Sequence, residues 1–219
     1  MSAGSRVPYL LGVPVVLGLD LLRRAVDSVQ PLWPHTIIID NTDAGLDQAD
    51  WPVHVLRPSV PLSFSQSMNL LQRLARERAC QATLLLHSDA AVAPWTAQRL
   101  LEVVETAFAE HPRWGVAFTN YDTFAAFNLA MADEVGPWDT TLPHYFADTD
   151  YYRRVRLAGW ELIHTGLPVA HNPSSTINLD ARRHQLHRVT FPLYAQYYTA
   201  KWGGPPDSET FDRPFDEAI

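Results

Sequence analysis

Short apolar runs alternate with longer segments of helical periodicity along the first half of the chain. Leu10–Leu17 is an uninterrupted apolar run, which is typical of a strand buried on both faces. Leu19–Val29 follows with apolar residues at helical spacing. The same criteria predict strands at His35–Asp40, Val53–Leu56 and Thr83–Leu86, and helices at Ser63–Ala79 and Pro94–Glu110. This β-α-β-β-α-β-α order predicts an open α/β sheet, which binds ligands beyond the carboxyl ends of its strands.

The second half of the chain is patterned less regularly. It predicts strands at Trp114–Thr119, Phe124–Ala130 and Glu161–His164, a helix at Asp148–Ala158, a loop at Pro168–Ser175 and a last helix from about Asp180 to Trp202. We expect that last helix to break near Pro192. No internal repeat and no long linker is present, so we expect one α/β domain with a mixed, mostly parallel sheet flanked by helices, followed by an irregular tail over residues 205–219.

Composition and charge narrow the classes of function. The chain has 17 Lys and Arg against 24 Asp and Glu, a formal net charge of −7, which weighs against binding to duplex nucleic acid. The single cysteine, Cys80, excludes an internal disulfide and a multi-cysteine metal site, and favours a cytoplasmic location. Pro8 and Pro14 make the N-terminal region unlike the apolar segment of a signal peptide, and no stretch reaches the length that spans a bilayer. We therefore expect a soluble, unprocessed protein.

Two carboxylates follow predicted strands. Asp89 comes directly after a buried strand, where it could ligate Mg²⁺ or Mn²⁺ or simply cap the next turn. His87, two residues before Asp89, is interpreted as part of the wall of a pocket. Asp40 could accept hydrogen bonds from a nucleoside, although for this residue alone an Asx turn is the better explanation.

Further candidate groups lie in the second half of the chain. Asp148 and Asp150 open a predicted helix, where helix capping would account for both and a general base is the functional alternative. His171 lies alone in a predicted loop, and a lone loop histidine is usually not a metal ligand. The sequence lacks a nucleophile elbow, a Walker phosphate loop and a dinucleotide-binding glycine pattern, which leaves metal-assisted or carboxylate-based transfer.

Taken together, the segments resemble the family 2 glycosyltransferases of GT-A fold over about Val13 to Gly204. In the first half the resemblance rests on Val13–Val16, on Ile37–Asn41, on Phe64–Leu71 and on Leu84–Asp89, where His87 replaces the first Asp of the D-x-D motif. In the second half it rests on Val135–Asp139, on Phe146–Tyr151 with the following Arg154, on Val169–His171 and on Tyr197–Gly204.

The resemblance implies metal-dependent, inverting transfer of a hexose from a nucleotide-diphosphate sugar, most simply a UDP-sugar, to a hydroxyl acceptor that the sequence does not identify. It implies a nucleotide-sugar-binding half over about residues 1–110 and an acceptor half over about 111–204. Asp148 would be the general base, and Asp89 with His171 would hold Mn²⁺ or Mg²⁺. The implied nucleotide-sugar-binding residues are Pro14, Asp40, Asn69, His87, Ser88 and Asp89. The implied acceptor pocket comprises Trp138, Tyr145, Asp150 and Tyr151.

Other interpretations stay open from the sequence. His87 in place of Asp, and Ala147 where the family has Glu, are compatible with a domain that binds a nucleotide sugar without catalysis. A nucleotidyltransferase would be expected to show a glycine-rich loop and a lysine after the first strand, and Leu17–Asp20 offers neither. The aromatic residues of the last helix are interpreted as core or as the seam of a homodimer.

Overall fold

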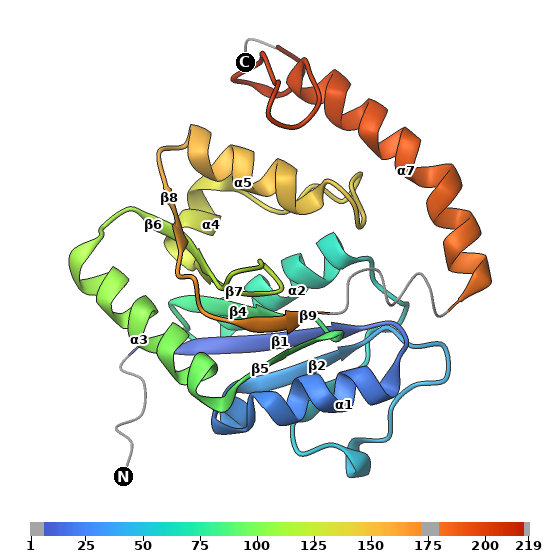
Figure 1. Ribbon diagram of the computed structural model, residues 1–219, viewed down its shortest axis with the longest axis vertical. Helices are drawn as coiled ribbons and strands as arrows, with labels where there is room; N and C mark the ends of the chain where they lie inside the picture. The colour runs from blue at the N-terminus through green and yellow to red at the C-terminus, as the bar shows by residue number, and fades with distance from the viewer. Residues whose placement is uncertain (1–6, 172–179, 217–219) are drawn as a thin grey trace.

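The central sheet is mixed and mostly parallel, as predicted (Figure 1). In the computed structural model, which describes residues 7–171 and 180–216, its strands are β1 (Tyr9–Val15), β2 (Thr36–Asp40), β3 (His54–Leu56), β4 (Ala82–Leu86), β6 (Trp114–Phe118), β7 (Phe124–Asn128) and β8 (Glu161–His164). Their order is β3-β2-β1-β4-β7-β6-β8. The first four strands are parallel, β7 is antiparallel to both β4 and β6, and β8 is parallel to β6.

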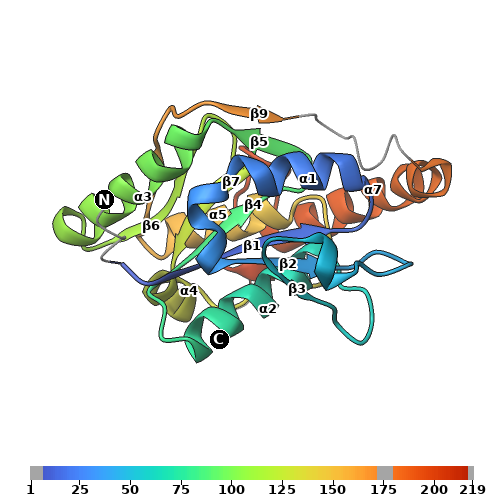
Figure 2. The same cartoon turned by 90° about the horizontal axis from the view of Figure 1, so that it is seen from below.

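Helices cover both faces of this sheet. They are α1 (Leu19–Ser28), α2 (Phe64–Glu77), α3 (Pro94–Glu110), α4 (Leu129–Val135), α5 (Ala147–Leu157) and α7 (Ala181–Trp202), with short 3-10 turns at Gln30–His35, Gln48–Asp50 and Pro214–Asp216. Figure 2 shows α1 and α3 on one face and α2 and α4 on the other. Alternation along the strands fills both layers: Leu11 and Val13 of β1 pack toward α1 and α3, whereas Leu10 packs with Leu71 of α2.

Local signals explain several helix boundaries. Ser63 caps α2 in a capping box with Gln66, in which each side chain bonds the other residue's backbone N–H. Pro94 opens α3 in the first turn, where no backbone donor is needed. The predicted limits of helix α3 and of strand β8 are confirmed. The four strands predicted in the first half of the chain agree with the structure within two residues at each end.

Two predictions about the second half were wrong, and one predicted strand ends two residues earlier than expected. The expected loop at Pro168–Ser175 contains a strand, β9 (Val169–His171), which pairs antiparallel with an unpredicted strand, β5 (Ala90–Val92); residues 172–175 of that loop lie outside the described residues. The predicted strand at Phe124–Ala130 ends at Asn128, because the Asn128 side chain accepts a hydrogen bond from the backbone N–H of Ala130 and caps α4.

The predicted break of the last helix does not occur either. Pro192 lies on the exposed surface of α7, where the loss of one backbone donor does not end the helix. Figure 1 shows α7 as a long outer helix that passes beside α5 and beyond the end of the sheet. No helix in the described part of the chain has both the length and the apolar character needed to cross a membrane.

Candidate active site

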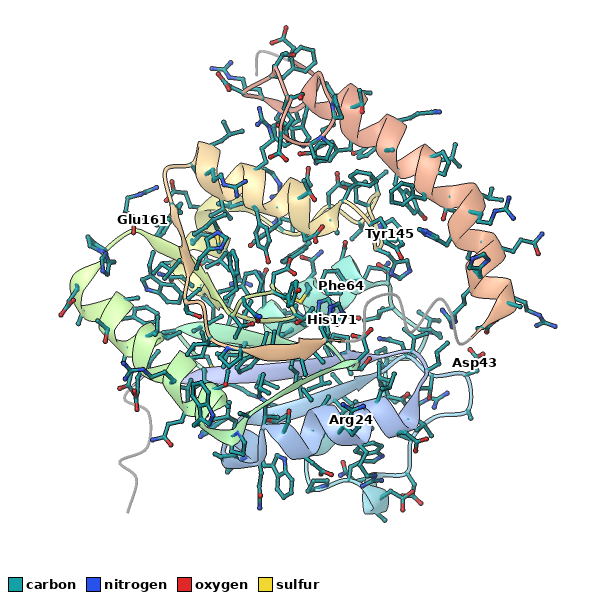
Figure 3. The ribbon with its side chains drawn as sticks, in the orientation of Figure 1. Arg24, Asp43, Phe64, Tyr145, Glu161 and His171 are labelled. Carbon is teal, nitrogen blue, oxygen red and sulfur yellow. The ribbon has the colours of Figure 1, made fainter. Side chains whose placement is uncertain are left out.

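A cavity of about 460 Å³ opens at the carboxyl ends of β1 and β4 and extends to α7. Pro14 of β1 and the residues that follow β4 line its sheet end, and α7 contributes the opposite wall. In Figure 3, Phe64 and His171 lie close together at the sheet end, and Tyr145 lies toward α7. Eight of the predicted site residues line this cavity: Pro14, His87, Ser88, Asp89, Trp138, Tyr145, Asp148 and His171.

Two histidines and one carboxylate converge at the sheet end. His87 and Asp89 follow β4, and the pairing of Ala90 with His171 brings β9 against this segment. One potential ligand atom from each of His87, Asp89 and His171 lies within 4.8 Å of the others, and Nε2 of His171 lies 3.5 Å from Oδ1 of Asp89. Two imidazoles and a carboxylate form a donor set that suits a first-row divalent metal. The sequence had assigned His87 to a pocket wall, and the structure adds it to this group.

The protonation of His87 agrees with a ligating role. Desolvation lowers the pKa of its imidazole, against the opposing effect of the carboxylates of Asp122 and Asp89. The ring is therefore neutral at physiological pH, with a nitrogen lone pair available for a metal. Phe64 contacts the same ring edge-on, with the ring centroids 5.6 Å apart, and helps to fix its orientation.

Asp148 lies in the first turn of α5 and faces the same cavity. Its Oδ1 accepts a hydrogen bond from the backbone N–H of Thr149 at 2.8 Å. Burial, together with the neighbouring carboxylate of Asp122, raises the pKa of Asp148 above that of an ordinary aspartate. A half-buried carboxylate with a raised pKa is a stronger proton acceptor than an exposed one.

Asp122, which sequence reasoning missed, lines the cavity together with Tyr152. Tyr152 donates a hydrogen bond to Oδ2 of Asp122 at 3.3 Å. Asp122 lies in the turn between β6 and β7, and the backbone N–H of His87 donates to the carbonyl oxygen of Thr123 at 2.8 Å. Residues Asn120–Thr123 look like an ordinary hairpin turn, so only the long-range pairing of β4 with β7 reveals their position.

Asp40 is held by its own loop. Its buried carboxylate accepts hydrogen bonds from the backbone N–H and hydroxyl of Thr42, at 2.9 and 2.6 Å, and from the backbone N–H of Leu46 at 2.9 Å. Arg57 adds an ion pair at 3.1 Å. Burial alone would raise the pKa of Asp40, but these donors lower it. The described lining residues include its neighbour Asn41 and not Asp40, so its predicted contact with a nucleoside stays a prediction.

Asn69 and Tyr151 support the cavity wall from behind. Asn69 bonds both backbone groups of Trp138, accepting from its N–H at 2.8 Å and donating to its carbonyl at 3.0 Å. The Trp138 ring stacks on Tyr151 with the centroids 4.2 Å apart and the planes 6° from parallel. Among the described residues that line the cavity, Trp138 is present and the other two are absent. The structure thus places Asn69 and Tyr151 where they fix Trp138.

Asp150 belongs to a buried charge cluster behind α5. It accepts a hydrogen bond from Nε1 of Trp202 at 2.9 Å and pairs with Arg154 at 3.0 Å and with Lys201 at 2.7 Å. Lys201, the single lysine of the chain, also pairs with Asp139 at 2.7 Å. Burial raises the pKa of Asp139, but the bond from Lys201 and further hydrogen bonds outweigh it and lower that pKa to about 2.

These contacts tie the end of α7 to the helix that carries Asp148. Tyr198 and Trp202 of α7 are buried within the chain, so they belong to its own core and not to an exposed seam between copies. Asp150 is not among the described residues that line the cavity. Its position fits a role in holding α5, not in forming the wall of an acceptor pocket.

Solved structures with the same fold were found, although no protein-family model and no curated protein matches the sequence. A structure of GalNAc-T7 with UDP, GalNAc and Mn²⁺ matches with a TM-score of 0.59 and 12% identity, over 89% of this chain and 51% of that one. Glucosyl-3-phosphoglycerate synthase from Mycobacterium tuberculosis, with Mg²⁺ and UDP, matches with a TM-score of 0.57 and 13% identity, over 85% and 79%. TarS of S. aureus, residues 1–349, matches with 0.54 and 11%, over 73% and 58%.

The chain thus spans about half of the GalNAc-T7 chain and 58% of the TarS chain. At this identity the similarity concerns the fold. The protein has the fold of the GT-A glycosyltransferases.

Proposed function

We propose that this protein is a family 2 glycosyltransferase that moves a sugar from a nucleoside diphosphate to an acceptor hydroxyl with inversion. One observation supports this above the others: the His87–Asp89–His171 group and the carboxylate of Asp148 face the same cavity at the carboxyl ends of the sheet. Such sheets bind nucleotides at this edge. A group of potential metal ligands beside a half-buried carboxylate suits glycosyl transfer, in which an acceptor hydroxyl loses a proton and a diphosphate leaves.

His87, Asp89 and His171 would hold Mn²⁺ or Mg²⁺. Because two of the three donors are imidazole nitrogens, we propose that Mn²⁺ binds more tightly than Mg²⁺, which prefers oxygen ligands. A bound ion supplies positive charge that stabilises the departing diphosphate. The structures of GalNAc-T7 and glucosyl-3-phosphoglycerate synthase contain UDP with such ions, and we propose UDP as the donor nucleotide here.

Asp148 would act as the general base. In a single displacement, the acceptor oxygen forms its bond to the anomeric carbon as the bond from that carbon to the diphosphate oxygen breaks on the opposite face. The acceptor proton moves to the Asp148 carboxylate, whose raised pKa makes it a better acceptor. The configuration at the anomeric carbon is thereby inverted. The ordered Trp138 would help to orient the reactants.

Binding of UDP tests the proposal directly. Isothermal calorimetry should show UDP binding that strengthens when Mn²⁺ is added, and strengthens less with Mg²⁺. Asp20→Asn, at an exposed position of α1, is the matched control for Asp89→Asn, because it should leave both the UDP affinity and its metal dependence unchanged. A protein that binds no UDP with either metal would contradict the proposal.

The rival functions give different results in the same preparation. A binding domain without catalysis would hold UDP-glucose and Mn²⁺ but would not release UDP over time, whereas a transferase slowly passes the sugar to water. A nucleotidyltransferase would bind UTP in preference to UDP-glucose. Measurement of UDP release and comparison of the two ligands therefore separates the three functions.

A further inference from the structure

The α7 end of the cavity differs in charge from the sheet end. The sheet end carries the carboxylates of Asp89 and Asp122, and the base Asp148 lies at the start of α5. The α7 end carries Arg183 and the imidazoles of His144 and His187. Helix α7 itself contains three arginines, one lysine and no acidic residue, although the whole chain has a net charge of −7. Of these four cations, Arg183 lines the cavity.

The polar groups at the α7 end are set among aromatic rings. His187 packs against Tyr145 with centroids 4.4 Å apart, and against Phe191 with centroids 5.2 Å apart. Its Nδ1 is buried and, within residues 7–171 and 180–216, has no hydrogen-bond partner. A buried polar nitrogen without a partner carries a desolvation cost that a ligand atom would remove.

Arg183 and His144 lie near enough to influence each other. Desolvation and the charge of Arg183 lower the pKa of His144. Its ring is therefore neutral and has one N–H that can donate to a ligand. Within the described residues, Arg183 forms one long ion pair, 3.9 Å from its Nε to Oδ2 of Asp180, and its side chain is 35% exposed. A guanidinium in this setting presents a planar set of donors that matches a phosphate or a carboxylate.

The position of Asp148 indicates which reactant reaches this end. Tyr145 immediately precedes the turn into α5, so the α7 wall adjoins the base. The donor diphosphate belongs at the opposite end, with the metal-ligating group. A molecule whose hydroxyl reaches Asp148 would extend toward Arg183 and His187.

We propose that Arg183, His144 and His187 form an anion subsite for the acceptor, which carries a phosphate or carboxylate near the hydroxyl that is glycosylated. This inference rests on the proposed function for its assignment to the acceptor. The anion subsite itself can be measured whether or not the protein transfers sugar.

Phenyl phosphate is a suitable probe, because its ring can pack on Tyr145 and its phosphate can reach Arg183. Binding is followed by titration in two-dimensional amide NMR, with and without saturating UDP and Mg²⁺. Benzyl alcohol is the neutral control ligand. Exposed Arg182, the neighbouring residue of α7, is absent from the described cavity lining, so Arg182→Gln is the matched control variant.

Arg183→Gln should weaken phenyl phosphate about tenfold, the effect of one lost charge-assisted hydrogen bond, and Arg182→Gln less than about twofold. His187→Phe keeps a ring against Tyr145 but loses both nitrogens, and it should weaken the probe about fivefold. Neither Arg variant should change UDP affinity more than about twofold. The amide spectrum shows that each variant is folded.

Three outcomes would overturn the inference. Equal weakening by the two Arg variants would mean general attraction to the helix, and equal binding of benzyl alcohol and phenyl phosphate would mean that no anion is recognised. Weakened UDP binding in Arg183→Gln would assign the anion to the donor diphosphate. Failure of the wild-type protein to bind UDP would contradict the proposed function instead. The anion subsite would then be judged from phenyl phosphate binding in the absence of UDP.

Discussion

β2 and β4 are both buried parallel strands in one half of the sheet. Asp40 is the last residue of β2 and Asp89 lies just beyond the end of β4, but the two aspartates have different surroundings. Asp40 accepts three hydrogen bonds and an ion pair from the loop after its strand and from Arg57. Asp89 lies instead beside two imidazoles at the edge of the cavity.

The difference lies in what the following chain does. After β2, residues 41–46 turn back so that the backbone N–H groups of Thr42 and Leu46 donate to Asp40, and its charge is compensated locally. After β4, the chain continues into β5, which pairs with β9 from far along the sequence and brings His171 to Asp89. The Asp40 carboxylate is thus held by hydrogen bonds from its own loop, whereas the Asp89 carboxylate lies beside His171 at the edge of the cavity.

The same contrast recurs within one turn of α5. Asp148 faces the cavity with a raised pKa, while Asp150 points to the other side and is fully buried against Lys201, Arg154 and Trp202. One aspartate is fit to exchange a proton, and the other holds the helix in place. Substitutions in each pair therefore test whether its two aspartates have these different roles.

The largest effect is expected at Asp148. Asp148→Asn should slow the metal-dependent hydrolysis of UDP-glucose about 10²–10⁴-fold, the usual contribution of a general base, with UDP affinity little changed. In the wild-type protein the rate should rise with pH through the raised pKa of Asp148, because only the ionised carboxylate accepts a proton. The time course of UDP release at several pH values measures both effects.

Stability provides the control for that variant. A carboxyl group whose pKa is raised by folding destabilises the native state as the pH rises from its ordinary pKa through the raised value. The side chain introduced by Asp148→Asn is neutral and avoids this loss, and its amide oxygen can still accept the bond from Thr149. The melting temperature of Asp148→Asn at neutral pH should therefore equal or exceed that of the wild type. If this folded variant hydrolysed UDP-glucose at the wild-type rate, Asp148 would not be the general base.

The next effect concerns the buried cluster behind α5. Lys201→Met should lower the free energy of unfolding by about 3–5 kcal/mol, because it leaves buried carboxylates without their shared cation. Urea unfolding measures the loss. Arg156→Met, which removes an exposed cation from α5, should change the stability by no more than about 0.5 kcal/mol. Equal losses in the two variants would show that the cluster contributes no special stability.

The sequence predicts the parts of this molecule that depend on neighbours in the chain. The apolar run of β1, the Ser63 cap of α2 and the Pro94 start of α3 are local signals, and the structure agrees with each. The strand β9 has only three residues, and its stability comes from pairing with β5, which no local pattern announces.

The candidate site divides in the same way. Asp89 and Asp148 were found because motif order places them, and both face the cavity. Asp122 was missed because its contact with the site depends on the antiparallel insertion of β7 beside β4. The resemblance placed Asp150 in the acceptor pocket, because the lysine that pairs with it lies far along the chain, at Lys201 in the last turn of α7.

The smallest expected effect returns to the two strand ends. Asp89→Asn should weaken Mn²⁺ binding by at least about tenfold, since even residues behind metal ligands contribute about 10–100-fold, and should leave the fold intact. Asp40→Asn should have the opposite effect: its amide nitrogen cannot accept the hydrogen bonds that Oδ2 takes from Leu46 and Arg57, so about 1–3 kcal/mol of stability should be lost with Mn²⁺ affinity unchanged. Calorimetry with Mn²⁺ and urea unfolding of both variants test this crossed pattern. If Asp40→Asn weakened Mn²⁺ binding as strongly as Asp89→Asn does and kept the wild-type stability, the hydrogen bonds around Asp40 would not explain why it takes no part in metal binding.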